Sequence, residues 1–170
     1  YVVAAKRRRR LAARLRQTVR EGRDRMRALM LGQLPEDLRG ARVLDAGCGS
    51  GRDAKAFHEM GYLVDAFDAS SAMVELARQH TRLPVQLMSF SEIDGNALYD
   101  GIWCCASLLH VPSSELPAVM QRLADALKPG GVWYVSFKYG NGERVQGERR
   151  FTDMDEKGLR KLLCAVPGVE

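Results

Sequence analysis

The segment from Ala41 to Gly51 combines a short apolar run with three closely spaced glycines, and no other feature constrains the fold as strongly. Residues 43–46 read as a buried strand that leads directly into a turn with glycines at positions 47, 49 and 51. Glycine adopts positive φ without steric cost and lets a ligand approach the backbone closely. A strand followed by such a turn is typical of α/β folds that bind nucleotide cofactors.

A second acidic position indicates which cofactor fits. Asp68 ends the next apolar segment and lies 21 residues after Gly47, close to the roughly 20 residues that place a carboxylate on ribose hydroxyls. Arg52 stands where the dinucleotide pattern G-x-G-x-x-G requires its third glycine. Asp45 adds negative charge beside the loop, which disfavours a pyrophosphate and favours a cationic group. These residues favour S-adenosylmethionine, with its sulfonium and ammonium, and leave a nicotinamide oxidoreductase as an alternative.

Strand-like and helix-like segments alternate along the rest of the chain. We expect strands at 41–46, 62–67, 83–88, 99–106 and 132–137, and helices at 53–60, 71–80, 112–127 and from 152 onward. This rhythm predicts an α/β, Rossmann-like fold with a doubly wound parallel sheet and helices on both faces. Ligands bind such sheets at the carboxyl ends of the strands. The polar and aromatic residues from 137 to 152 are expected to form a loop over the site.

Positive charge is concentrated at the start of the chain. Residues 1–40 hold 12 Lys and Arg against 4 acidic residues, although the whole chain has a net charge of only +5. We therefore expect a basic, amphipathic helical arm over 1–40 and a cofactor-binding domain over 41–170. Residues 6–27 carry enough arginine to attract nucleic acid, but no aromatic residues alternate with the arginines to stack on bases. A helix whose apolar stripe covers the fold is the preferred interpretation.

Cysteine usage and hydropathy indicate the compartment. The four cysteines, at 48, 104, 105 and 164, lack the C-x-x-C spacing of a zinc or redox motif. No apolar run approaches the roughly 18 residues of a membrane span. We expect free thiols, no metal site and a cytoplasmic protein.

Several motifs resemble known methyltransferases. The run 43–51 resembles motif I of class I S-adenosylmethionine-dependent methyltransferases, and 68–70 resembles the acidic motif that follows it. Residues 41–166 are similar to tellurite-resistance-type small-molecule methyltransferases, whereas 18–50 are similar to magnesium-protoporphyrin O-methyltransferases. The two resemblances imply different acceptors and the same chemistry.

The resemblance implies methyl transfer from S-adenosylmethionine to a small molecule. A nucleic-acid methyltransferase and a non-catalytic cofactor-binding fragment are the alternatives. The class I fold usually continues with two antiparallel strands beside strand five, and this sequence is expected to lack them. Strand five would then form an edge of the sheet.

The candidate site residues follow the expected strand ends. Ser89 and Phe90 take the place where the family often carries an acid for the adenine amino group, and the resemblance places Ala106 beside the methyl-transfer site. The predicted cofactor contacts are Asp45, Ala46, Gly47, Cys48, Gly49, Gly51, Arg52, Asp68, Ala69, Ser89, Phe90 and Ala106. His110 is the candidate catalytic residue, because imidazole is a common general base near neutral pH. A hydrogen-bonded loop histidine is the alternative.

Overall fold

A computed structural model describes residues 21–33, 40–147 and 149–168, and its main sheet has five parallel strands in the order β3-β2-β1-β4-β5. The strands are β1 (Arg42–Ala46), β2 (Leu63–Asp68), β3 (Gln86–Leu87), β4 (Tyr99–Cys104) and β5 (Leu127–Val135). The helices are α1 (Glu21–Leu31), α2 (Arg52–Glu59), α3 (Ser71–Thr81), α4 (Leu116–Ala126) and α5 (Glu156–Cys164), with short 3-10 turns η1 (Phe90–Glu92) and η2 (Leu108–His110). The predicted parallel α/β sheet is confirmed.

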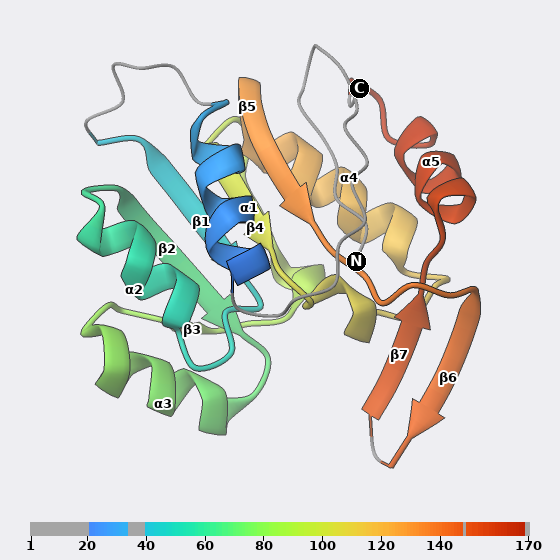
Figure 1. The fold of residues 1–170 in the computed structure, drawn as a ribbon, viewed down its shortest axis with the longest axis horizontal. Helices are drawn as coiled ribbons and strands as arrows, with labels where there is room; N and C mark the ends of the chain where they lie inside the picture. Colours follow the sequence, from blue (N-terminus) through green and yellow to red (C-terminus); the bar gives the residue numbers. More distant parts are fainter. Residues whose placement is uncertain (1–20, 34–39, 148, 169–170) are drawn as a thin grey trace.

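Helices cover both faces of this sheet, as Figure 1 shows. Helices α1, α2 and α3 lie on one face, and α4 and α5 lie on the other. Alternate residues of a strand point to opposite faces. Val43 of β1 accordingly packs with Met30 of α1 and Phe57 of α2, whereas the neighbouring Leu44 belongs to the cluster that includes Met120 of α4. The doubly wound arrangement therefore follows from apolar residues at consecutive strand positions.

The ends of two helices and one strand are defined by local contacts. The cap of α3 is Ser70, whose Oγ accepts the Met73 N–H at 3.4 Å. The cap of α4 is Glu115, without a side-chain hydrogen bond, so this helix begins later than the predicted position 112. Strand β5 begins at Leu127, which pairs with Tyr99 of β4, and the pairing shifts register before it resumes at Val132 opposite Gly101. The strand therefore begins five residues before the predicted position 132.

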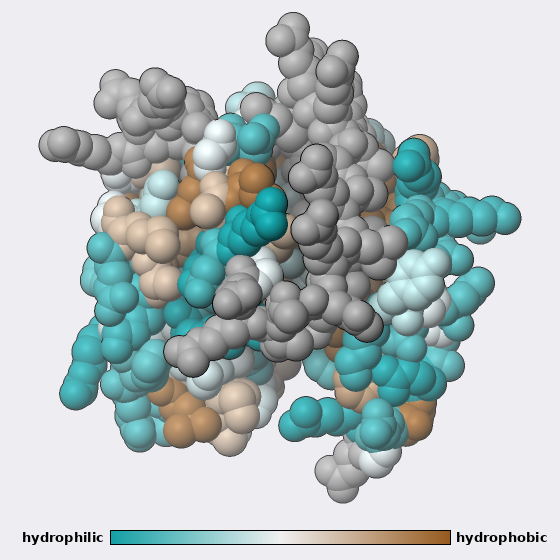
Figure 2. Space-filling model, viewed as in Figure 1, coloured by the Kyte–Doolittle hydropathy of each residue, from teal (hydrophilic) through white to brown (hydrophobic). Residues whose placement is uncertain are grey.

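A β-hairpin occupies the region where the sequence predicted an irregular loop. Strands β6 (Gly142–Gln146) and β7 (Arg149–Asp153) pair antiparallel with each other and extend from the carboxyl end of the main sheet (Figure 1). Polar residues lie on both faces of this hairpin, and Figure 2 shows mostly hydrophilic side chains over it. The alternation of apolar and polar residues that predicts a strand is therefore missing. Phe151, which is buried, anchors it.

Helix α1 is the part of the expected basic arm that the structure describes, together with the residues next to it. It packs on the sheet through Met30, and its Arg27 forms a buried ion pair with Asp53 at the start of α2. Arg52 and Arg23 also face Asp53, at 3.0 and 3.9 Å. One buried carboxylate thus joins α1 to α2. Residues 1–20 and 34–39 of the expected arm lie outside the described residues.

None of the helices in the described ranges is long and apolar enough to cross a membrane.

We expect Arg27→Met to lower the free energy of unfolding by about 3 kcal/mol, since removing one partner of a buried ion pair leaves the other charge uncompensated. Arg52 and Arg23 still face Asp53 in this variant. Because they partly compensate its charge, the expected loss of unfolding free energy lies at the lower end of the range for buried ion pairs. Urea denaturation measures it. Arg25→Met, on the exposed side of α1, is the matched control. An equal loss of unfolding free energy in both variants would show that the ion pair between Arg27 and Asp53 does not stabilise the fold.

Candidate cofactor site

The glycine turn is fixed between β2 and β4. The backbone N–H groups of Gly47 and Cys48 both donate to the Phe67 carbonyl, at 3.0 and 2.9 Å. Gly47 has φ +72°, and a Cβ there would lie 2.5 Å from the Cβ of Ser107, just beyond β4. A Cβ on Gly51 (φ +78°) would lie 2.6 Å from a methyl group of α3. Only glycine permits both close approaches.

Gly49, between these two, faces open space. Its φ is +56°, and no atom lies within 4 Å of the position that a Cβ would occupy. The loop is therefore closed toward the protein at Gly47 and Gly51 and open at Gly49, which leaves room for a ligand against the backbone.

Asp68 holds the open part of the loop in place from the end of β2. One carboxylate oxygen accepts the Gly49 N–H at 2.8 Å, and the other accepts the Ser70 N–H at 2.9 Å. A carboxylate oxygen has two acceptor positions, so each retains one for a ligand hydroxyl. The two backbone bonds fix the orientation of the carboxylate. Ala69, which follows it, is exposed.

Asp45 lies buried beneath the loop and has an unusual electrostatic environment. Burial raises its pKa well above the ordinary value, the nearby Asp53 and Asp68 act in the same direction, and a hydrogen bond from the Ala54 backbone opposes them. Its Oδ2 makes no hydrogen bond within the described part of the chain. Ala46, the next residue, is fully buried, so it shapes the floor of the loop.

Cys48 is a packing residue at neutral pH. Burial raises the pKa of its thiol, and the negative charges of Asp45 and Asp68 raise it further. A protonated thiol is a weak nucleophile.

The wall opposite Asp68 is built by η1 and by the residues after β4. Phe90 packs edge-on against Phe67 with ring centroids 5.2 Å apart, and its ring reaches the region in front of Gly47. Ala106 has φ +53° and donates its N–H to Ser136 Oγ at 2.8 Å. The sequence prediction missed Ser107, whose buried Oγ has no partner among the described residues. No sequence signal identified Ser136, because it lies 30 residues from Ala106.

Ser89 has a local role in addition to its predicted one. Its Oγ lies 2.6 Å from Glu92 Oε2, and its N–H donates to the same oxygen at 2.7 Å. The two hydrogen bonds lower the pKa of Glu92. This capping box is readable in the sequence as Ser-x-x-Glu. Contact between Ser89 and adenine stays a prediction.

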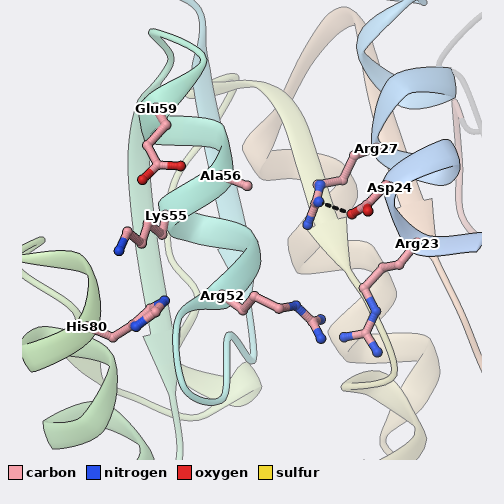
Figure 3. A pocket seen from close by; sticks show the side chains of 8 residues that line it. All are labelled: Arg23, Asp24, Arg27, Arg52, Lys55, Ala56, Glu59 and His80. Carbon is pink, nitrogen blue, oxygen red and sulfur yellow. Dashed lines mark hydrogen bonds and ion pairs between the residues drawn. The ribbon is translucent and has the colours of Figure 1, made fainter. Parts of the chain in front are cut away.

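Arg52 points toward α1 and pairs with Asp53. Figure 3 shows its guanidinium approaching that of Arg23 across a cavity of about 310 Å³ beside α2. The cavity shares only Arg52 with the predicted cofactor contacts. Arg23 and Arg27, which the sequence prediction did not single out, add positive charge at this end of the glycine turn.

His110 ends η2, beyond the wall formed by Ser107. Its Nδ1 lies 2.9 Å from the backbone carbonyl oxygen of Arg150 in the hairpin, and its ring lies 5.0 Å from that of Phe151. The ring is exposed to solvent. His110 is therefore hydrogen-bonded, as the alternative interpretation required, while Nε2 stays open to a ligand.

Residues 43–131 match the methyltransferase domain family. The chain belongs to this family. It is 49% identical over 118 residues to a magnesium-protoporphyrin O-methyltransferase of Rhodobacter capsulatus, covering 65% of this chain and 52% of the relative. It is 33% identical over 107 residues to a ubiquinone biosynthesis O-methyltransferase of Xanthomonas oryzae, covering 59% of this chain and 44% of the relative.

A solved structure agrees with the assignment. The Burkholderia thailandensis 1,6-didemethyltoxoflavin-N1-methyltransferase, solved with its substrate and S-adenosylhomocysteine, is 29% identical with a TM-score of 0.65, over 85% of this chain and 70% of that one. The chain spans about half the length of the curated relatives it matches. The class I methyltransferase resemblance and the Rossmann-like fold are both confirmed.

We expect Gly47→Ala to destabilise the fold by roughly 1–3 kcal/mol more than Gly49→Ala, because both force a side chain into positive φ but only the first meets Ser107. Thermal unfolding of the two variants measures the difference. Equal melting temperatures would show that the contact with Ser107 does not constrain the turn.

The environment of Asp45 predicts a pH-dependent effect. Because its folded-state pKa is raised, its contribution to stability is complete below the ordinary value of 3.8 and is lost as pH rises through the folded-state value. Asp45→Asn cannot ionise, so the melting temperature of this variant should rise relative to that of the unsubstituted chain as the pH is raised above 3.8. Parallel melting curves across this range would contradict the assignment.

Proposed function

We propose that this chain binds S-adenosylmethionine and transfers its methyl group to a small-molecule acceptor. The observation that carries the proposal is the carboxylate of Asp68, held by Gly49 and Ser70 beside the open part of the glycine turn. A rigid acid in this place can accept hydrogen bonds from both hydroxyls of a ribose. Family membership over 43–131 supports the same chemistry.

The residues around the turn fit this cofactor. Gly49 leaves the backbone accessible, and the buried Oγ of Ser107 and Oδ2 of Asp45 lack partners among the described residues. Buried polar atoms without partners are uncommon, so both atoms support a polar ligand here. The negative charge of Asp68 favours a cationic ligand over a pyrophosphate.

Several of the predicted contacts then have a role. Asp68 orients the ribose, Gly49 allows close approach to the backbone, and Phe90 supplies an aromatic wall for the adenine. Arg52, with Arg23 beside it, is placed to attract the cofactor carboxylate. When bound, S-adenosylmethionine supplies an electrophilic methyl group on a sulfonium. The protein contributes mainly by orienting the reactants and excluding water.

The relatives support a small acceptor. Their names refer to magnesium protoporphyrin, ubiquinone biosynthesis and 1,6-didemethyltoxoflavin, and none refers to a nucleic acid. The nucleic-acid alternative depends on residues 6–27, of which 6–20 lie outside the described residues. Free thiols at all four cysteines support a reducing compartment such as the cytoplasm.

Calorimetric titration with S-adenosylhomocysteine tests the donor site. We expect Asp68→Ala to weaken binding by about 1.5–3 kcal/mol, the usual effect of losing a hydrogen bond to a charged group. Asp65→Ala is the matched control, because Asp65 lies on the same strand and pairs with Arg42.

Two outcomes would reject the proposal. One is binding of NADH in place of S-adenosylhomocysteine by the folded chain, and the other is equal affinity in the Asp68→Ala and Asp65→Ala variants.

A further inference from the structure

The cavity beside α2 carries an excess of positive charge. Its nitrogen-bearing side chains come from α1, α2 and α3, and they are Arg23, Arg27, Arg52, Lys55 and His80. The carboxylates in its lining are Asp24 and Glu59. Even with Asp53, the buried partner of Arg27, counted as a further carboxylate, the permanent positive charges outnumber the negative ones. Such a concave basic surface attracts anions.

The arginines of this cavity share few acceptors. One oxygen of Asp53 pairs with Arg27, which also pairs with Asp24. The other oxygen of Asp53 lies 3.0 Å from Arg52 and 3.9 Å from Arg23, and Figure 3 shows these two guanidiniums approaching each other. A guanidinium has five N–H donors, so most of the donors of Arg52 and Arg23 have no acceptor within the described residues. An anion between them would also relieve their mutual repulsion.

Lys55 and His80 supply further donors, on the opposite side of the cavity from Arg23 (Figure 3). Lys55 follows Arg52 by three residues on α2, so both side chains project from one face of this helix. The ring of His80 extends from α3 toward α2 (Figure 3). Neither side chain has an ion pair or hydrogen bond in the ranges that the structure describes. Both are therefore available to a ligand.

We propose that this cavity binds a small phosphorylated anion that carries at least two negative charges. Arginine contacts phosphate oxygens through two parallel N–H bonds, and lysine contacts them as a point charge. The cavity volume of about 310 Å³ lies at the lower end of the range for small-molecule sites. The site shares only Arg52 with the predicted cofactor contacts, and its ligand is a second molecule distinct from the methyl donor.

Two acidic side chains favour a short anion over a nucleic acid. Asp24 borders the cavity on α1, with 64% of its side chain exposed. Glu59, which is exposed, borders it on α2 (Figure 3). A nucleic-acid backbone carries closely spaced charges over a long distance, so it would meet these carboxylates and be repelled. A small anion can lie among the basic side chains without reaching either acid.

Calorimetric titration with inorganic pyrophosphate at low ionic strength tests this site. We expect saturable binding by the unsubstituted chain. Lys55→Gln should weaken the affinity roughly fivefold or more, because a hydrogen bond from a charged group is lost, and His80→Gln should weaken it in the same direction. Lys161→Gln, on the exposed side of α5, is the matched control. It has the same net charge as Lys55→Gln and should bind pyrophosphate as the unsubstituted chain does.

Three outcomes would overturn the proposal. The first is the absence of saturable pyrophosphate binding by the folded chain. The second is equal affinity in the Lys55→Gln, His80→Gln and Lys161→Gln variants, which would place the anion elsewhere. The third is tighter binding of a short DNA duplex with the same dependence on Lys55, which would assign the cavity to a nucleic acid. The titration contains no S-adenosylhomocysteine, so its result does not depend on the function proposed above.

Discussion

The carboxylate of Asp68 is the link on which the candidate site depends. It ends β2 and accepts one N–H from the glycine turn after β1 and one from the turn into α3. The Phe67 carbonyl adds two further bonds to the same turn. Two parallel strands alone would leave their connecting loops free to move independently. The hydrogen bonds of Asp68 hold the loop at Gly49, and a loop that is already held costs a ligand less to order on binding.

The buried pair between Arg27 and Asp53 extends this rigid region to α1. Asp53 begins the helix that follows the glycine turn, so its position affects the turn directly. A carboxylate at a helix N-terminus is favoured by the helix dipole, and the guanidinium of Arg27 compensates the cost of burying it. The same arrangement brings Arg23 and Arg52 to the open end of the turn. Part of the basic segment therefore has a structural role in the protein core.

The sequence predicted the strand, the glycine turn and the following helix well because their determinants are local. Gly47, Gly49, Gly51 and Asp68 occupy a strand–turn–helix unit whose pattern is set by steric requirements over a few residues. The hairpin was missed because β6 has no buried residue, so no apolar alternation marks it. The unpartnered hydroxyl of Ser107 and the contact between Ala106 and Ser136 depend on packing between distant segments. Such contacts leave no periodic signal in a single sequence.

The glycine turn and His110 are held in place by different parts of the fold. The predicted donor contacts Asp45 and Asp68 lie at the ends of β1 and β2, which the parallel sheet fixes, whereas His110 is hydrogen-bonded to a hairpin outside that sheet. The hairpin is joined to η2 by a few hydrogen bonds and by the buried ring of Phe151. Changes in the hairpin can therefore move the segment 108–113 without disturbing the glycine turn. The names of the relatives refer to different methyl acceptors, and one fold can carry many specificities through the sites built on it.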